Sequence, residues 1–589
     1  MPNYQAPLRD MRFVYQELLT GNEVSDLPGF EEVDEELIDA ILEEAGKFCA
    51  NVLQPTARAG DEEGCHFENG EVQVPADFHA IYQIFTEAGW HAMAMSPKYG
   101  GQGLPKSLHM MVDEMISSCN ISFGLLPALS NGAYNAMAAY ASDELKDIYF
   151  PPIAEGRWSG TMCLTESHCG TDLGLLRTRA EPQKDNSYLI TGSKIFITWG
   201  EHKLTENIIH LVLARTPDAP PGIKGISLFV VPKYVVNSDG SLGEKNGVSC
   251  GSIEHKMGIH GSPTCVINLD AAKGYLVGDV NKGMRAMFVM MNTERLMVGF
   301  QGLGLAEIAY QGAVKYARER LQGRAPTGPK QPEKEADSLL VHADVRRMLL
   351  TMRAYTEGMR ALGIWIGIQV DIASHHTDEQ RRTEADELVA LMTPVIKALF
   401  TDLGSECTNL GVQVFGGHGY ISEHGMEQLV RDVRITQLYE GTNGIHAMDL
   451  VGRKLSLLGR FTRPVNAFIA AHKDEDELTE FIEPLQSALN RLQSASDWLQ
   501  QAATEDPHHP GAVACDYLRL LGLTTMAFQW ACAAQLALPK VAAEDGAFYR
   551  AKVHTARFFM QRLLPQTAAL ELSIKAGADS VMAFDDDAF

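Results

Sequence analysis

The chain has 589 residues, of which 45% are hydrophobic and 21% are charged, the composition of an ordinary globular protein with several domains. Its formal net charge of −25 argues against nucleic acid as a partner, because nucleic-acid binding depends on concentrated lysine and arginine. The sequence has no run of 18 uninterrupted apolar residues, so no transmembrane segment is expected.

The spacing of the cysteines indicates a reducing compartment, and neither the cysteines nor the histidines have the spacing of a metal-binding site. Ten cysteines are scattered without paired spacing, which suits reduced thiols better than a disulfide framework or a zinc site. The pairs His375-His376 and His508-His509 have no acid or cysteine at ligand spacing. The opening Met1-Pro2-Asn3-Tyr4 leads into no apolar core of a signal peptide. We therefore expect a cytoplasmic protein.

Residues 1–158 are predicted to form a helical domain. Apolar residues recur near the helical period over 35–53, where Leu37, Ile38 and Leu42 are examples. Turn signals at Tyr99-Gly100-Gly101 and at Pro151-Pro152 punctuate this region.

Residues 159–278 change to the period of two that is typical of strands. The predicted strands cover residues 188–191, 195–198, 208–213, 226–231 and 265–269. Clusters of glycine and proline separate them, for example at 219–222. A small β domain is expected between helical ones.

Residues 279–455 return to helical patterns and predict a bundle. Long helices are expected over 345–372 and 387–414. Gly299, Gly302 and Gly304 lie inside a helical pattern without a preceding strand, so a nicotinamide site is not expected.

Residues 456–589 are predicted to be an additional helical domain. Helical patterns cover 517–536 and 548–564, and Pro507 to Gly511 interrupt them. The fold class expected for the whole chain is α+β, mostly α.

Leu164 to Asp172 form the first segment with chemical content. Thr165 and Thr171 bring hydroxyl groups, and Gly170 permits a close approach of the backbone. Such a loop can donate hydrogen bonds to a flat ring and to a pyrophosphate. A plain turn after a strand is the alternative interpretation.

Leu438 to Gly444 form the second segment, with Glu440 between Tyr439 and Gly441. A carboxylate beside an apolar ligand loses water and becomes more basic, which suits it to take a proton from a carbon next to a carbonyl. A glutamate in a loop is otherwise solvated surface.

These two motifs, in the order helix, β, helix, resemble the acyl-CoA dehydrogenase family over about residues 30–455. The opening Tyr4 to Phe13, the loop Gly200-Glu201-His202 and the C-terminal extension are similar to the 3-methylmercaptopropionyl-CoA dehydrogenase subgroup. The resemblance implies an N-terminal helical domain, a middle β-barrel-like domain, a C-terminal helical bundle and the extra helical domain.

The resemblance also implies FAD as the cofactor. The matching cofactor positions are Met162, Leu164, Thr165, Gly170, Thr171, Phe196, Thr198, Arg320, Gln413, Gly416, Gly417, Thr442 and Asn443. Of these, Arg320 and Gln413 match positions that reach the flavin of a neighbouring subunit, which implies a homodimer or a larger homo-oligomer. The chain departs from the usual family pattern at Ser167, Cys169 and Trp199, and also at Leu321 to Gly323, the three residues that follow Arg320.

Glu440 matches the catalytic base of most of the family. In a minority of members the base comes from the position of Glu294, and this chain has both acids. Two carboxylates in one small pocket cannot both ionise at low cost. Glu440 is the predicted base, with Glu294 as the alternative. The matching substrate positions are Thr171, Asn292, Arg295, Tyr439 and Gly441.

The function implied by the resemblance is α,β-dehydrogenation of an acyl-CoA to 2-enoyl-CoA. The substrate would be 3-methylmercaptopropionyl-CoA or a medium- or long-chain fatty acyl-CoA, and electrons would pass to an electron-transfer flavoprotein. An acyl-CoA oxidase is the enzymatic alternative, and a non-catalytic CoA-binding scaffold is the alternative from another class.

Overall fold

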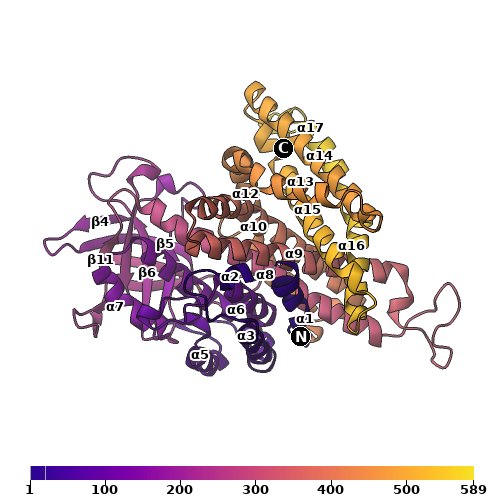
Figure 1. Ribbon diagram of the computed structural model, residues 1–589. Coiled ribbons are helices and arrows are strands. Elements are labelled where there is room, and N and C mark those ends of the chain that lie inside the picture. The colour runs from indigo at the N-terminus through magenta and orange to yellow at the C-terminus, as the bar shows by residue number, and fades with distance from the viewer. Residues whose placement is uncertain (1, 20–21) are drawn as a thin grey trace. The chain divides into compact units, whose positions relative to one another are not determined.

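The computed structural model describes residues 2–19 and 22–589 (Figure 1). The chain forms two compact units, each assembled from separate stretches of sequence. Unit 1 comprises Met1–Lys47, Lys106–Ser118 and Val298–Phe589, and unit 2 comprises Phe48–Pro105 and Cys119–Met297. The predicted fold class, α+β with mostly helix, is confirmed. The four domain boundaries stay a prediction.

Unit 2 contains helices around a sheet. Its helices include α4 (Thr56–Glu63), α5 (Asp77–Glu87), α7 (Asp143–Ala154) and the later part of α6 (Lys106–Tyr140). A hairpin of β1 (His66–Glu68) and β2 (Glu71–Gln73) lies between α4 and α5. The helical prediction for 1–158 missed this hairpin, although Asn69 and Gly70 carry its signature with φ angles of 53° and 81°.

The sheet of unit 2 has the strand order β3-β6-β7-β11-β5-β4, and β10 also pairs with β11. Its strands are β3 (Trp158–Cys163), β4 (Arg179–Pro182), β5 (Tyr188–Thr198), β6 (Asn207–Ala214), β7 (Ser227–Pro232), β10 (Val248–Ile253) and β11 (Thr264–Val277). Among the described strands of this sheet, β3 and β6 pair in parallel and the other neighbours pair antiparallel. The predicted strands at 188–191 and 195–198 are one strand, β5. A separate pair is formed by β8 (Tyr234–Val236) and β9 (Leu242–Lys245).

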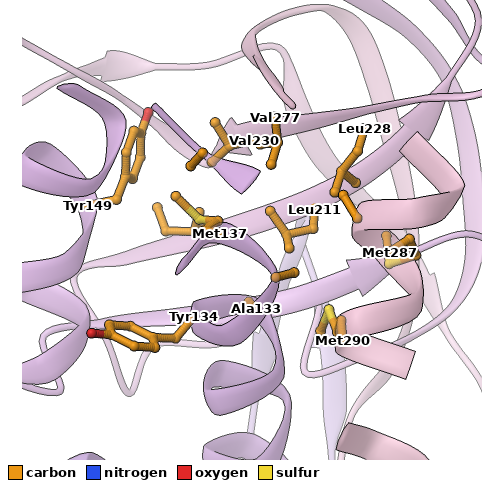
Figure 2. Close-up of a cluster of buried hydrophobic side chains, with 14 of the residues drawn as sticks. Ala133, Tyr134, Met137, Tyr149, Leu211, Leu228, Val230, Val277, Met287 and Met290 are labelled. Carbon is orange, nitrogen blue, oxygen red and sulfur yellow. The ribbon is translucent and has the colours of Figure 1, made fainter. Parts of the chain in front are cut away.

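A hydrophobic core joins the sheet of unit 2 to its helices (Figure 2). Leu211, Leu228 and Val230 come from β6 and β7, whose residues are all buried. Met137 of α6 and Met287 of α8 (Gly283–Glu319) meet them from the helices. Burial along the whole of two neighbouring strands explains why both read as nearly continuous apolar runs.

The bundle of unit 1 is built on the later part of α8, α9 (Ala343–His375) and α10 (Glu379–Phe415). A Cβ atom on Gly302 of α8 would lie 2.6 Å from the carbonyl oxygen of Phe400, and one on Gly404 of α10 would lie 2.6 Å from that of Gly302. The glycines of the predicted helix therefore serve close packing of α8 against α10. The shorter helices α11 (Met426–Arg434) and α12 (Asn443–Asp449) follow.

The C-terminal extension is helical, as the sequence predicted. Its helices are α13 (Gly459–His472), α14 (Thr479–Glu505), α15 (His509–Ala537), α16 (Gly546–Phe558) and α17 (Gln566–Lys575). Among the described residues, Glu379–Tyr420 and His509–Lys540 are long and apolar enough to cross a membrane, but 78% and 83% of their apolar windows are buried inside the protein. Such burial is typical of core helices.

The N-terminal segment also belongs to unit 1. It includes α1 (Leu8–Arg12), a π-helical turn (Phe13–Leu18), the short α2 (Asn22–Ser25) and α3 (Glu35–Phe48). Arg9 donates to Asp545 at 2.8 Å and to Tyr549 at 3.0 Å, and Phe13 meets Phe548 edge to face. The N-terminal segment therefore packs on and hydrogen-bonds to the C-terminal extension.

Candidate functional site

The residues predicted to bind cofactor and substrate divide between the two units. Unit 2 holds Met162, Leu164, Thr165, Gly170, Thr171, Phe196, Thr198, Asn292, Glu294 and Arg295, and unit 1 holds Arg320, Gln413, Gly416, Gly417, Tyr439, Glu440, Gly441, Thr442 and Asn443.

In unit 2, the loop after β3 is held by a buried ion pair. The Lys194 ammonium lies 2.9 Å from Oε1 of Glu166 and donates to the Leu164 carbonyl at 2.9 Å. Glu166 also accepts from the N–H groups of Arg177 and Thr178, at 2.8 and 3.0 Å. Burial by itself would raise the pKa of Glu166, but Lys194, the Thr178 hydroxyl and the Arg177 N–H lower it to about 2. Glu166 is therefore an anion that fixes the loop.

This fixed loop presents the predicted flavin-binding residues. The Ile195 N–H donates to the Thr165 carbonyl at 2.9 Å, so Thr165 is tied to β5. Glu166 and Cys169 exchange two backbone hydrogen bonds, which places the atypical Ser167 at the tip of a tight turn. Gly170 and Thr171 follow this turn and are exposed. Hydroxyl and backbone groups are thus displayed on a rigid support.

Strand β5 carries a bulge at the predicted aromatic position. Cys265 of β11 pairs with Ile197, whereas Ile267 pairs with Lys194, so β5 has one extra residue. Phe196 accommodates this with a φ of 60° and is 59% exposed. The bulge interrupts the alternation of the strand between Lys194 and Ile197. The bulge turns a large aromatic ring toward solvent, which is how bulges serve binding sites.

The atypical Trp199 has a structural role. Its indole N–H donates to the Ser122 carbonyl at 3.2 Å, and its side chain is fully buried. Its backbone N–H donates to the Pro263 carbonyl at 2.8 Å. Trp199 thereby anchors the end of β5 just after Thr198, which is half-buried.

The acid at 294 lies against another helix of unit 2. Glu294 is only 2% exposed, and a Cβ atom on Gly132 of α6 would come within 2.5 Å of its Oε1. Arg295 is half-buried and donates to Asn292 at 3.2 Å, while Asn292 is exposed. Glu294 thus occupies a helix-packing position, and the predicted CoA-binding pair forms one surface.

In unit 1, Glu440 has a backbone conformation that is rare for its residue type. Its φ is 57°, and that of Gly441 is 91°. The His446 ring lies 3.0 Å, through Nε2, from the Glu440 carbonyl oxygen. The Tyr439 hydroxyl donates to Gln301 of α8. Non-glycine residues with positive φ gather at functional sites, so this geometry marks the loop as a candidate site.

The Asn443 side chain supports this loop. Its Nδ2 donates to Asp402 at 2.7 Å and to Thr401 at 2.9 Å, and its Oδ1 accepts from Lys397 at 2.9 Å. The amide predicted to bind the cofactor is thus used to dock the loop on α10. Thr442, in contrast, is exposed at the start of α12.

The predicted contacts to a neighbouring subunit lie at one end of α8 and α10. Arg320, Gln413, Gly416 and Gly417 are all exposed. One helical turn before Arg320, Tyr316 stacks on Phe415 with ring centroids 4.2 Å apart, and its hydroxyl lies 2.9 Å from His418 Nδ1. These contacts brace the glycine segment between Phe415 and His418.

The residues present fit a flat, anionic cofactor such as FAD. The loop after β3 displays hydroxyl groups, Phe196 displays an aromatic ring, and Arg320 displays a cation. A Cβ atom on Gly416 or Gly417 would meet no atom within 4 Å, so the backbone there is open to a ligand. Hydrogen-bond donors, a ring and a cation are groups that can bind a polar, flat and negatively charged dinucleotide.

Sequence reasoning missed the supporting residues Lys194, Lys397 and His446. A lysine inside a long apolar run was the available signal for Lys397, because it stands between Ile396 and Ala398 in a buried helix. The partner of a buried lysine follows from tertiary contacts, which no local pattern contains.

Four family models together match most of the chain, between residues 35 and 585. They are described as the acyl-CoA dehydrogenase N-terminal domain (residues 35–157), middle domain (161–272) and C-terminal domain (281–455), and as an acetyl-CoA dehydrogenase C-terminal-like domain (461–585).

Individual proteins resemble the chain over nearly its whole length. A 3-methylmercaptopropionyl-CoA dehydrogenase of Ruegeria pomeroyi is 43% identical over 98% of this chain and 99% of its own. The Caenorhabditis elegans protein ACDH-11, in complex with C11-CoA, has a TM-score of 0.79 at 19% identity and covers 99% of this chain and 96% of its own. A Bacillus anthracis acyl-CoA dehydrogenase complexed with FAD has a TM-score of 0.73 at 19% identity and covers 98% and 92%.

Proposed function

The chain belongs to the acyl-CoA dehydrogenase family of flavin-dependent oxidoreductases, and we propose that it converts an acyl-CoA thioester to the 2-enoyl-CoA. In this reaction a proton leaves the α carbon and a hydride leaves the β carbon. The observation that carries the proposal is Glu440, a carboxylate on a left-handed backbone inside the loop Tyr439 to Asn443.

We propose FAD as the cofactor. When bound, it would supply the oxidising chemistry by accepting the β hydride. Thr165 and Thr171 would donate hydrogen bonds to it, Phe196 would pack on it, and Arg320 would reach it from a neighbouring subunit. The remaining proposed contacts are Met162, Leu164, Gly170, Thr198, Gln413, Gly416, Gly417 and Thr442. Support comes from the exposed donors, the open glycine backbone and the FAD complex of the Bacillus anthracis relative.

Glu440 is proposed as the base that takes the α proton. Its backbone N–H would polarise the thioester oxygen, and Tyr439 would form a wall of the pocket. Glu294 is less suited to this role, because its carboxylate is packed against Gly132 of α6. Asn292 and Arg295 would contact the CoA part of the substrate, since they form one partly exposed polar surface.

Matched amide variants test this assignment. Glu440→Gln is expected to lower turnover by about 10²- to 10⁴-fold, the usual contribution of a general base, while FAD content stays unchanged. Glu294→Gln is expected to keep a turnover close to that of the parent protein. Normal activity of Glu440→Gln together with an inactive Glu294→Gln would transfer the role of base to Glu294.

The proposed substrate is either 3-methylmercaptopropionyl-CoA or a medium- or long-chain fatty acyl-CoA. The first is supported by the Ruegeria pomeroyi relative at 43% identity, and the second by the C11-CoA complex of a protein with the same fold. A comparison of kcat/KM for 3-methylmercaptopropionyl-CoA, butyryl-CoA, octanoyl-CoA and palmitoyl-CoA would decide between them.

An electron-transfer flavoprotein is proposed as the electron acceptor of a cytoplasmic homodimer or larger homo-oligomer. Little hydrogen peroxide is then expected when the protein turns over acyl-CoA in air, with fast turnover on addition of the flavoprotein. One peroxide per enoyl-CoA formed would instead identify an oxidase. Light scattering would measure the oligomeric state.

A further inference from the structure

Glu440 is held in a conformation that its own residue type disfavours. Its φ of 57° lies in the left-handed region, which is unfavourable for a residue that carries a Cβ atom. Such a conformation persists where neighbouring contacts impose it. The contacts that impose it here come from Lys397 of α10 and from Asn443 and His446 of α12.

Lys397 of α10 provides the central contact. Its side chain is fully buried, and its ammonium donates to the Gly441 carbonyl at 2.7 Å and to Oδ1 of Asn443 at 2.9 Å. Gly441 follows Glu440 directly, so the ammonium holds the peptide next to the one that carries the carboxylate. Hydrogen bonds from a charged donor are about twice as strong as neutral ones.

Charges on both sides orient the Asn443 amide. Its oxygen faces the Lys397 ammonium, and its nitrogen donates to the Asp402 carboxylate at 2.7 Å. The Gln437 amide donates to the same Asp402 oxygen at 2.6 Å. The Asn443 amide is thus hydrogen-bonded to the Lys397 ammonium on one side and to the Asp402 carboxylate on the other. Through Gln437 and Asn443, residues before and after Glu440 are hydrogen-bonded to α10.

A lysine is a costly choice for this position. A buried ammonium loses its hydration, and this loss is tolerated only where acceptors replace the water. Packing alone could be served by an apolar residue of similar length. What the ammonium adds is hydrogen bonds that fix the conformation of the loop. A fixed loop matters for catalysis, because a misplacement of about 1 Å in a reacting group can cost 10²-fold in rate.

We infer that Lys397 is a positioning residue that keeps Glu440 in place during removal of the α proton. It acts in part through its hydrogen bond to Asn443. The inference rests on the proposed role of Glu440 as base. Lys397 itself touches neither substrate nor cofactor in this role. It acts through the Gly441 carbonyl and the Asn443 amide.

The test compares Lys397→Met with Lys552→Met. Both variants remove a buried ammonium from unit 1, but Lys552 contacts Asp10 and Glu357 and not the Glu440 loop. With octanoyl-CoA and an artificial electron acceptor, kcat per bound FAD is expected to fall about 10²-fold in Lys397→Met. The KM for octanoyl-CoA should change little. In Lys552→Met, stability should fall while kcat per bound FAD stays at the parent value.

The isotope effect of α-deuterated octanoyl-CoA separates positioning from folding. It is expected to rise in Lys397→Met, because slower proton removal limits the rate more fully. A variant that merely folds poorly would lose active protein and leave the isotope effect per active site unchanged. A parent-like kcat per bound FAD, or a reduced kcat with an unchanged isotope effect, would overturn the inference.

Asn443→Ala gives a second route if Lys397→Met does not fold. It keeps the bond from Lys397 to the Gly441 carbonyl and removes the amide, so a smaller loss of kcat with a raised isotope effect is expected. Parent-like kinetics in this variant would contradict the inference. Failure of the proposed function is recognised separately, since Glu440→Gln would then remain active.

Discussion

Lys552 and Asp10 form a buried ion pair although 542 positions separate them in the sequence. Asp10 also accepts from Arg360, whose guanidinium bonds Glu114 and Glu307 at 2.6 Å each. Lys552 further pairs with Glu357 at 2.6 Å, and Arg353 with Glu357 at 2.7 Å. Four carboxylates therefore share three cations where the two ends of the chain meet α9.

Two amide variants in this cluster should differ in stability. Asp10→Asn removes the carboxylate that Lys552 and Arg360 share, and breaking a buried pair costs about 3–5 kcal/mol. Glu114→Gln should cost much less, because burial raises the pKa of Glu114 to about 7 against the pull of Arg360. Chemical denaturation at pH 6 would measure both. Equal losses would show that Glu114 is ionised at pH 6 and does not hold a proton.

The pH dependence of stability should change in Glu114→Gln. The folded protein holds the Glu114 proton up to about pH 7, whereas the unfolded chain releases it near its ordinary pKa of 4.5. Deprotonation of the unfolded chain therefore lowers stability as pH rises between these values, by at most about 1.4 kcal/mol per pH unit. The variant lacks this loss. The difference between its melting temperature and that of the parent should therefore increase in favour of the variant from pH 4.5 to 7, and stay constant above pH 7. Parallel profiles throughout would contradict the assignment.

Lys194→Met should weaken FAD binding. The variant removes the donor to the Leu164 carbonyl and leaves the Glu166 carboxylate without its cation. We expect the Kd for FAD to rise at least about tenfold, equivalent to 1.4 kcal/mol, in a fluorescence titration of apoprotein. Lys273→Met is the matched control, because it removes a partly exposed pair with Asp185 in the same unit. An equal Kd in the two variants would rule out the ion pair as the support of the loop.

Gly302→Ala should destabilise unit 1. The added methyl group would lie 2.6 Å from the Phe400 carbonyl oxygen, and overpacking of this kind costs about 1–3 kcal/mol. Gly452→Ala is the control, since a Cβ atom at Gly452 meets no atom within 4 Å. Thermal unfolding should therefore separate the two variants. A melting temperature of Gly302→Ala equal to that of the control would mean that α8 and α10 adjust without cost.

Local patterns predicted most elements because helix and strand periods are properties of short segments. The helix expected over 345–372 is α9, and the strand expected over 208–213 is β6. The bulge at Phe196 and the fusion of two predicted strands into β5 were not predictable in this way. Both depend on the partner strand β11, which lies about 70 residues away in the sequence.

By itself the sequence determined the family, the order of helical and β regions, and the motif that carries Glu440, because these reside in contiguous residues. Only the tertiary structure decided which groups hold that motif in place. Lys397 reaches the Gly441 carbonyl, and Lys194 reaches Glu166, across 44 and 28 positions of sequence. A buried charge is stable only beside its acceptors, and which acceptors lie beside it is known only once the chain has folded.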